Sequence, residues 1–503
     1  MKRCLLTILA VFVLISSYAQ KSSKYEFRGV WVQTVFQMQY QTMNKQRMQD
    51  YFINMLDTFQ QLGFNALIFQ VRPEADAFYK SEIEPWSRFF TGVQGMAPSE
   101  NWDPMEFLIE ECHKRGMEFH AWLNPYRVTA SLNQPLSPNH IYFKHPEWFV
   151  SYGGKIYFDP GLPQSRRHFC TVIKDIVSRY DVDAIHMDDY FYPYPVNGEK
   201  FPDDETFAIY GPRQGFAATQ KEDWRRYNTD MLVSQIKQTI RQVKPWVRFG
   251  VSPFGIYRNK KSTPDGSGSE TNGLQNYDDL YADILKWDRE GWIDYNMPQI
   301  YWEIGHTAAD YKTLIEWWNN NTTQAHLYIG QDVNRSVRAP EQSSPNKNQM
   351  DTKIDMARRL SKVNGNCFWY GTDIMADNGG IKLQLNKLHG QAAMVPPYPN
   401  LYNLRPREVK GLKAKWTPNG YVLMWKEYKE KNPMDQHVAW AVYQFDKGER
   451  IDLNNSSALV GVTRDPFIKL PYNDGKKKYT YVVTSINRTN IESLKGKKKS
   501  VKL

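Results

Sequence analysis

The sequence is poor in cysteine and, beyond its N-terminus, in long apolar runs. Only 4 of its 503 residues are cysteine, which excludes a scaffold held together by disulfide bonds. A membrane-spanning helix needs about 20 consecutive apolar residues, and no run after the N-terminus reaches that length. We therefore exclude an integral membrane protein and expect no transmembrane segment.

Several motifs of well-known enzyme classes are also missing. The chain has no His-Glu-x-x-His helix, no Cys-x-x-Cys pair, no P-loop and no Gly-x-Ser-x-Gly turn. These patterns mark zinc proteases, redox or zinc sites, nucleotide hydrolases and serine esterases. Nothing in the sequence indicates a carboxylate-bound calcium or magnesium ion, so we expect neither a metal nor a cofactor.

The N-terminus has the pattern of a signal peptide over residues 1–19. Lys2 and Arg3 precede an apolar stretch from Cys4 to Ile15, and Ser17-Tyr18-Ala19 offers small residues for cleavage. A buried N-terminal helix is the alternative. No cysteine follows the apolar stretch, so we expect export to the periplasm, cell envelope or medium without a lipid anchor. The cysteines left after cleavage fit buried thiols: Cys112, Cys170 and Cys367.

Positive charge is concentrated near the C-terminus. The whole chain carries a formal net charge of +10, and residues 401–503 hold 21 Lys and Arg against 10 Asp and Glu, a net +11. Lysine runs at 476–478 and 497–499 could attract an anionic wall polymer, a phospholipid or a nucleic acid. Solvated turns and a frayed tail are the simpler interpretation. Neither run is interleaved with aromatic residues, so we do not expect nucleic acid as a partner.

Residues 25–394 alternate between apolar strand-like runs and amphipathic helix patterns, which predicts a (β/α)₈ TIM barrel. An open doubly wound sheet is the competitor, but the Gly-rich phosphate turn of that fold is missing after the first strand. The expected strands are Phe27–Val35, Asn65–Pro73, Met117–Tyr126, Asp183–Tyr190, Arg248–Gly255, Asp294–Glu303, His326–Val333 and Gly365–Asp373. The expected helices are Asn44–Leu62, Pro104–Arg115, Ser165–Tyr180, Lys221–Val243, Tyr277–Arg289, Tyr311–Asn319 and Asp351–Val363.

A proline-rich break at 395–399 precedes a different pattern. Short alternating strands with turns predict a small all-β sandwich over residues 400–503. The expected strands are Tyr421–Trp425, Trp440–Phe445, Ala458–Val462, Phe467–Leu470 and Tyr479–Ile486. The segment looks like a fibronectin type III domain, mainly through Tyr479-Thr480-Tyr481-Val482-Val483, Asn487 and Glu492-Ser493.

Polar and aromatic residues gather at the C-terminal ends of the expected barrel strands, where barrel enzymes place their active sites. Aromatic faces stack on pyranose rings, while amides and carboxylates bind hydroxyl groups. We therefore expect a polysaccharide substrate. The candidate binding residues are Trp31, Gln70, Arg72, Glu74, His120, Trp122, Asn124, Tyr126, His186, Tyr190, Ser252, Gln299, Tyr301, Trp302, Asp332 and Asp373.

Glycosidic bond hydrolysis commonly uses two carboxyl groups, one as acid and one as nucleophile or base. Asp188 and Asp189 end the fourth strand. Strand alternation turns Asp188 into the barrel mouth, which makes it the preferred nucleophile or base, whereas Asp189 sits at the rim or caps the next turn. Glu303 shares strand parity with Gln299 and Tyr301 and is the preferred acid; a solvent-exposed loop position is its alternative.

Glu74, Asp332 and Asp373 are further candidates for the acid, because they also follow strand ends.

Six segments span most of the expected barrel. They are Phe27-Arg28-Gly29-Val30-Trp31-Val32, Asn65-Ala66-Leu67-Ile68-Phe69-Gln70-Val71-Arg72-Pro73, Ala121-Trp122-Leu123-Asn124-Pro125-Tyr126, Asp183-Ala184-Ile185-His186-Met187-Asp188-Asp189-Tyr190-Phe191-Tyr192-Pro193, Gly250-Val251-Ser252-Pro253-Phe254-Gly255-Ile256 and Met297-Pro298-Gln299-Ile300-Tyr301-Trp302. Together, in this order, they resemble the glycosyl-hydrolase-like family 10.

The resemblance implies a secreted or envelope glycosidase. A characterised relative in that family cuts peptidoglycan glycan strands stripped of their stem peptides. Our leading hypothesis is a glycoside hydrolase acting on peptidoglycan glycan or a related amino-sugar polymer. Hydrolysis of an unrelated environmental or host polysaccharide is an alternative. Two others are a non-catalytic glycan-binding protein on a barrel scaffold and a tethering protein that attaches through its basic C-terminal segment.

Overall fold

The computed structural model describes residues 24–339 and 347–503. The expected signal peptide and the expectation of a chain without a lipid anchor concern residues outside this part. In the described residues, Cys112 and Cys367 are buried and Cys170 is half-buried, all three as free thiols. Among the helices of these residues, none has the length and apolar character required to cross a bilayer.

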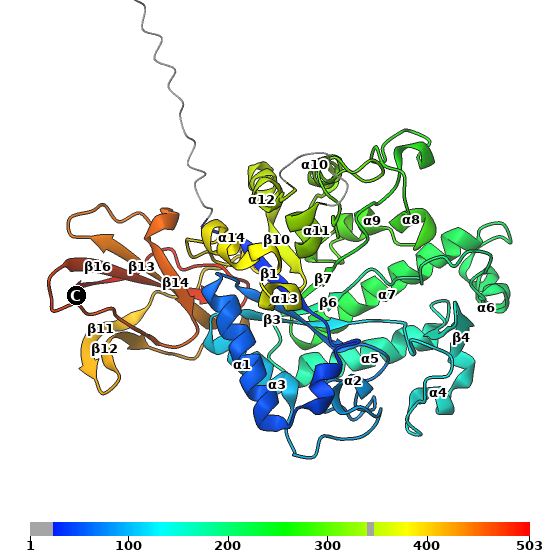
Figure 1. Cartoon of the computed structure of the whole chain (residues 1–503), viewed down its shortest axis with the longest axis horizontal. Coiled ribbons are helices and arrows are strands. Elements are labelled where there is room, and N and C mark those ends of the chain that lie inside the picture. Colours follow the sequence, from blue (N-terminus) through cyan, green and yellow to red (C-terminus); the bar gives the residue numbers. More distant parts are fainter. Residues whose placement is uncertain (1–23, 340–346) are drawn as a thin grey trace, which may run out of the picture.

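Eight parallel strands form a closed barrel, so the expected barrel is confirmed and the open sheet is excluded (Figure 1). The first strand closes the ring by pairing with the last, from Phe27 opposite Gly365 to Val30 opposite Phe368. Around the ring the order is β1-β10-β9-β8-β7-β6-β3-β2. The strands are β1 (Phe27–Val32), β2 (Ala66–Arg72), β3 (Glu118–Leu123), β6 (Ala184–Met187), β7 (Arg248–Val251), β8 (Tyr295–Asn296), β9 (His326–Asp332) and β10 (Val363–Trp369).

Helices surround this ring, with one at or near each predicted position. The predicted helix over 277–289 is interrupted after its first turn, and a short hairpin of β4 (Phe149–Tyr152) and β5 (Lys155–Phe158) was not predicted. The helices are α1 (Lys45–Gln61), α2 (Arg88–Thr91), α3 (Pro104–Lys114), α4 (Ile141–Lys144), α5 (Pro163–Arg179), α6 (Asp204–Tyr210), α7 (Lys221–Val243), α8 (Asn276–Asp279), α9 (Ile284–Arg289), α10 (Tyr311–Asn321), α11 (Val333–Arg338), α12 (Met350–Arg359), α13 (Gly371–Met375) and α14 (Ile381–Leu388).

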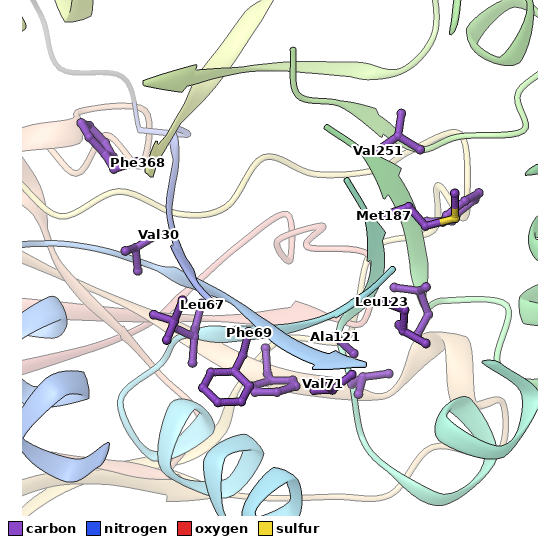
Figure 2. Close-up of a cluster of buried hydrophobic side chains, with 14 of the residues drawn as sticks. Val30, Leu67, Phe69, Val71, Ala121, Leu123, Met187, Val251 and Phe368 are labelled. Carbon is purple, nitrogen blue, oxygen red and sulfur yellow. The ribbon is translucent and has the colours of Figure 1, made fainter. Parts of the chain in front are cut away.

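Strand alternation divides the apolar residues into two cores. The larger core lies between the strands and the helices, and Figure 2 shows Leu67, Phe69 and Met187 pointing outward from the ring into it. The smaller core fills the inside of the barrel and includes Trp31 and Trp122. Because neighbouring residues on a strand face opposite sides, the residues between the outward-facing ones point inside the barrel, and those at the C-terminal strand ends face its mouth.

The C-terminal domain consists of two antiparallel sheets, with the orders β11-β12-β15 and β14-β13-β16-β17. All five predicted strands are present, but two others were missed. The strands are β11 (Lys410–Thr417), β12 (Gly420–Lys426), β13 (His437–Asp446), β14 (Leu459–Thr463), β15 (Phe467–Lys469), β16 (Lys478–Asn487) and β17 (Lys497–Lys502). The expectation of a frayed tail is therefore wrong for Lys497–Lys499, which pair with β16 in an edge strand. Lysines are common on such edges because they discourage pairing with other chains.

The C-terminal domain is attached to the N-terminal end of the barrel. Arg464 forms an ion pair with Asp183 at 2.6 Å, just before β6, and Asn490 donates to Glu118, the first residue of β3, at 2.9 Å. The proline-rich break is part of this contact. Its Tyr398 is 4% exposed, and its hydroxyl lies 2.5 Å from that of Tyr328 inside the barrel. The opposite, C-terminal end of the barrel remains free for a site.

Candidate active site

A cavity of about 330 Å³ opens at the C-terminal end of the barrel. Such a volume lies at the small end of ligand pockets, which span roughly 300–1,000 Å³, so it fits one part of a larger substrate. The lining residues come from the ends of nearly every barrel strand and the loops after them: Trp31, Gln33, Val35, Phe36, Gln70, Trp122, Arg127, Asp188, Asp189, Tyr190, Tyr194, Ser252, Gln299, Tyr301 and Trp369.

Ten residues expected to face the mouth or lie at its rim line this cavity or contact its carboxylates, and an eleventh, His186, supports the lining. Those that line it are Trp31, Gln70, Trp122, Asp188, Asp189, Tyr190, Ser252, Gln299 and Tyr301. Asn124 lies just behind, with its amide nitrogen 3.5 Å from both carboxylate oxygens of Asp188. His186 supports the lining from inside the barrel, with Nε2 3.0 Å from Oγ of Ser252.

Asp188 reaches the cavity because β6 ends at Met187, one residue earlier. Its carboxyl is 5% exposed. Burial and the neighbouring charge of Asp189 raise the pKa of Asp188 to about 7, against the opposing effect of the Arg127 guanidinium. A carboxyl group with this pKa holds a proton for much of the time near neutral pH, as a general acid must.

Asp189 also faces the cavity, rather than only the rim. Burial raises the pKa of its carboxyl to about 6, but the Tyr194 hydroxyl donates a hydrogen bond to Oδ2 and favours the ionised form. The Arg127 guanidinium acts in the same direction on both carboxyl groups. It is fixed by hydrogen bonds to the Pro73 carbonyl oxygen at 3.0 and 3.1 Å. The pair can therefore hold one proton and one negative charge together.

Four aromatic side chains form the walls beside these carboxyl groups. Trp31 meets Tyr301 edge-on at 6.5 Å between ring centroids and Trp369 at 6.4 Å. Trp369 also meets Trp122 edge-on at 6.2 Å and stacks against Tyr301 at 6.5 Å. Such mutually braced rings present fixed faces, on which the apolar side of a pyranose ring can stack.

Gln70 offers an oriented hydrogen-bond donor. Its side-chain oxygen accepts from the backbone N–H groups of Thr34 and Val35, at 3.0 and 2.9 Å. This fixes the amide, and within the described part of the chain Nε2 is buried without a hydrogen-bond partner. A buried donor costs free energy unless something accepts from it. The lining therefore suits a substrate with a carbonyl or hydroxyl oxygen at this point.

A chain of hydrogen bonds runs through the barrel beneath the aromatic walls. His186 Nε2 lies 3.2 Å from Nε1 of Trp31, and its Nδ1 lies 3.0 Å from the Tyr295 hydroxyl. The same hydroxyl lies 3.0 Å from Nδ1 of His120, whose Nε2 meets Glu118 at 3.0 Å. His120, expected at the mouth, is thus deep inside the barrel. Burial holds the pKa of His186 well below its usual value, so this ring stays neutral.

Glu303 does not line the cavity, so the expectation that it faces the mouth is wrong. Its side chain is fully buried, and Oε2 lies 3.6 Å from Nε of Arg335, under α11. The parity argument failed because β8 ends at Asn296. The chain beyond it bends, with Ile300 N donating to the Pro298 oxygen, and alternation cannot be extended through such a bend.

Three residues near the ends of β2 and β3 also lie outside the cavity, contrary to expectation. Arg72 is fully buried against α5, with an ion pair to Glu84 at 2.5 Å and the Phe169 ring 5.1 Å away. A register shift after Gln70 turns it outward. Glu74 is paired with Arg88 at 2.9 Å. Tyr126 is 2% exposed within the core between strands and helices. Each is held by packing or charge pairing away from the mouth.

The remaining candidates lie around the cavity without lining it. Trp302 packs edge-on against Phe254, with 5.3 Å between ring centroids. Asp332 caps α11 by accepting from the backbone N–H of Arg335 at 2.8 Å. Asp373 accepts from the side-chain amides of Asn334 and Asn378, both at 2.7 Å. Capping and loop fixation account for both carboxylates.

Sequence reasoning missed Val35, Phe36, Arg127 and Tyr194, which lie on loops, and Trp369, the last residue of β10. Phe36 is the most conspicuous, since it is 62% exposed and has a φ of +60°. Aromatic residues rarely adopt such a backbone, and this kind of strain is concentrated at functional sites. A positive φ leaves no mark in the sequence, so only structure could reveal it.

Within the described residues, no group of three or more His, Cys, Asp or Glu side chains is arranged to hold a metal ion.

Sequence comparisons with known proteins identify the family of this chain. Residues 26–349 match the model of the family described as Glycosyl hydrolase-like 10. The glycosyl hydrolase YngK of Bacillus subtilis (strain 168) is 40% identical over 512 residues, which cover 98% of this chain and 96% of YngK. The glycosyl hydrolase DigH of Escherichia coli (strain K12) is 39% identical over 333 residues, covering 62% of this chain and 74% of DigH.

Among solved structures, the glycoside hydrolase domain of PgaB (BpsB) from Bordetella bronchiseptica aligns with a TM-score of 0.47 and 10% identity, over 72% of this chain and 99% of that domain. The family match covers most of the barrel, and the match to YngK extends along nearly the whole chain. This protein therefore belongs to the glycosyl hydrolase-like 10 family and is a glycoside hydrolase.

Proposed function

We propose that this glycoside hydrolase cleaves the glycan strands of peptidoglycan outside the cytoplasm, with Asp188 and Asp189 as its acid and base. The observation that carries the proposal is the pair of carboxyl groups with raised pKa values in a cavity walled by aromatic rings. Because the chain belongs to a glycoside hydrolase family, a purely glycan-binding barrel is not needed to explain these features.

Two features of the lining favour an acidic amino sugar. The unpartnered amide nitrogen of Gln70 suits an acceptor such as the carbonyl of a 2-acetamido group. The Arg127 guanidinium supplies positive charge at the cavity, which suits a carboxylate. N-Acetylmuramic acid without its peptide carries both an acetamido group and a free lactyl carboxylate. A peptide on that carboxylate would remove its charge.

In the reaction, Asp188 protonates the glycosidic oxygen as the bond to the leaving sugar breaks. The Asp189 carboxylate, held ionised by the Tyr194 hydroxyl, stabilises the positive charge that develops on the sugar ring and accepts the proton of the incoming water. Asp188 thus takes the role of the acid that was expected of Glu303, because Glu303 does not line the cavity. The aromatic walls bury the carboxyl pair, and this burial raises the pKa of Asp188.

Substrates with different leaving groups test these roles. An acid catalyst is needed for a sugar leaving group but not for a good leaving group such as dinitrophenol. Asp188→Asn should therefore lose cleavage of glycan strands by about 10²–10⁴-fold and retain most activity on a dinitrophenyl glycoside. Asp189→Asn should lose activity on both. Asp265→Asn, in an exposed loop, is the matched control. Equal losses on both substrates in Asp188→Asn would contradict its role as the acid.

Incubation with a polymer panel tests the substrate. Intact peptidoglycan, peptidoglycan stripped of stem peptides, chitin and neutral plant polysaccharides are compared, with products read by mass spectrometry. We expect release of disaccharide-containing fragments mainly from the stripped glycan. Cleavage of an unrelated polysaccharide, with both peptidoglycan samples unchanged, would replace the substrate while leaving the catalytic assignment intact.

We further propose that the C-terminal domain is of the fibronectin type III kind. Its seven strands form one sheet of three and one of four, joined across a shared apolar core that includes Leu423, Trp440 and Val483. A two-sheet sandwich of this size is typical of that class of domain. Many cell-surface domains share this sandwich architecture, which agrees with the chain's expected export.

A further inference from the structure

Three aromatic side chains form an exposed cluster on the C-terminal domain, which we name the aromatic platform: Trp416, Tyr421 and Tyr472. Trp416 stacks on Tyr421 with 5.1 Å between ring centroids, and Tyr472 meets Trp416 edge-on at 4.8 Å. Trp416 is 60% and Tyr472 45% exposed. Tyr421 is half-buried against the domain core. Two exposed rings braced by a third are unusual, because isolated exposed rings are the common case.

The backbone holds the platform in a defined arrangement. Trp416 and Tyr421 are opposite residues of the β11–β12 hairpin, next to its turn. Leu470 donates its backbone N–H to the Tyr421 carbonyl oxygen at 2.8 Å, which places the segment carrying Tyr472 beside the hairpin. The pairing of β11 with β12 and the hydrogen bond between Leu470 and Tyr421 therefore hold the rings in place.

Positive charge borders the rings at Lys476. Lys469 lies opposite Val422, so it points to the other face of the sheet from Tyr421. Lys476 follows Gly475, which lies against the Tyr472 hydroxyl. Within the described residues Lys476 meets only the exposed Asp474, at 3.6 Å. Its ammonium group is therefore available to an external anion.

The platform lies far from the barrel. Lys477, beside the platform, exchanges two backbone hydrogen bonds with Leu503, and Figure 1 shows this chain end on the side of the domain away from the barrel. The contacts to the barrel are made elsewhere in the domain, by Arg464, Arg488 and Asn490. The platform and the cavity therefore face different directions and can bind separate glycan chains.

We propose that the aromatic platform is a second glycan-binding site, which takes a carboxylate-bearing polysaccharide. Pyranose rings would stack on Trp416 and Tyr472, while Lys476 pairs with a carboxylate of the same chain. Charge complementarity selects this occupant, since residues 401–503 carry a net +11. The site would keep the enzyme on an insoluble acidic matrix while the barrel cuts neighbouring strands. It does not depend on which polymer the barrel cleaves.

Polygalacturonate and its fully methyl-esterified form test the proposal, because they share one sugar backbone and differ only in charge. Binding is measured by affinity electrophoresis of the full-length protein. We expect retardation by polygalacturonate, weak retardation by the ester, and loss of binding as salt rises. Trp416→Ala and Tyr472→Ala should each weaken binding by about tenfold, and Lys476→Glu should reduce the preference for the charged polymer.

Phe467→Ala provides the matched control. Phe467 is 46% exposed on β15 of the same sheet but is not part of the platform, and this variant should bind as the unaltered protein does. Unchanged binding in both Trp416→Ala and Tyr472→Ala, or equal binding of the two polymers, would overturn the proposal. Melting curves of each variant separate loss of the site from loss of the fold. Because this assay requires no turnover, failure here is distinct from failure of the proposed peptidoglycan activity.

Discussion

Trp31 donates the N–H of its indole to Nε2 of His186, across 3.2 Å inside the barrel. The same Nε2 accepts from the Ser252 hydroxyl at 3.0 Å, so the proton of the neutral imidazole must lie on Nδ1, facing Tyr295. One buried histidine thus fixes an aromatic wall and a hydroxyl group of the cavity at once. None of these hydrogen bonds joins His186 to the carboxyl group of Asp188 or Asp189.

The first prediction concerns this positioning role. His186→Leu should leave the Trp31 N–H buried without an acceptor, which costs roughly 1–3 kcal/mol. We expect a lower melting temperature and a raised KM for soluble glycan fragments. The pH limbs of kcat should stay in place, because the carboxyl pair is unchanged. Trp246→Phe, which alters a tryptophan at the other end of the barrel, is the control. A shifted pH profile in His186→Leu would instead indicate direct participation in catalysis.

The second prediction concerns the pH dependence of the reaction. The carboxyl pair must carry one proton and one charge, and burial raises the pKa of Asp189 to about 6 and that of Asp188 to about 7. The plot of kcat/KM against pH should therefore be a narrow bell with limbs near these values. Asp189→Asn should remove the acidic limb from the residual activity. A broad plateau extending to pH 9 would show that Asp188 does not need its proton.

The third prediction concerns the cost of holding these carboxyl groups in the barrel. A folded-state pKa raised above the unfolded value of about 3.9 favours folding at low pH, and this advantage is lost as pH rises through the folded pKa. Above pH 7 the ionised pair opposes folding. Asp188→Asn should therefore raise the melting temperature at pH 8 and have little effect near pH 4. Thermal unfolding at both pH values checks this, and stabilisation at pH 4 alone would contradict it.

The fourth prediction concerns the contact between the domains. The Arg464 guanidinium helps to hold the pKa of the Asp183 carboxyl well below its usual range. Arg464→Met would leave this carboxylate in the interface with less charge compensation, at a cost of up to about 3–5 kcal/mol. The loss should be complete above pH 4 and diminish as pH falls further, since a lowered pKa stabilises the fold only while the group is ionised.

Arg488→Met is the matched control for the interface. Arg488 pairs with Asp181 at 3.0 Å, but that carboxylate is half exposed, and exposed pairs contribute only about 0–1 kcal/mol. Differential scanning calorimetry of both variants should show a clear loss for Arg464→Met and almost none for Arg488→Met. Equal losses would mean that the interface depends on its overall packing rather than on the buried charge of Asp183.

Most of the barrel could be predicted from local patterns. Long apolar runs such as Ala66–Phe69, covered on both faces, mark parallel strands, and Asp103 before Pro104 marks a helix start, where it accepts from two backbone N–H groups. The β17 strand was missed for the opposite reason. An edge strand gains its stability from pairing with β16, so its own sequence can be mostly lysine and resemble a disordered tail.

The candidate site was predicted only as far as strand alternation holds. Asp188 and Trp122 lie at strand ends in regular geometry, and both line the cavity. Glu303 was placed by continuing the alternation past Asn296, where the strand has already ended. Phe36, Arg127 and Tyr194 come from loops, whose conformation depends on contacts with distant segments. Arg127 is one example, because its place is set by the carbonyl of Pro73, more than fifty residues earlier.

The sequence by itself determined the order of strands and helices, the face of each strand that meets the helices, and the presence of two carboxyl groups where the fourth barrel strand ends. Those features follow from the period of apolar residues and need only neighbouring positions along the chain. Tertiary structure alone decided which side chains share a cavity, which charges neutralise one another, and how far burial raises the pKa of a carboxyl group. Such properties depend on solvent exclusion and on contacts between segments that are distant in sequence.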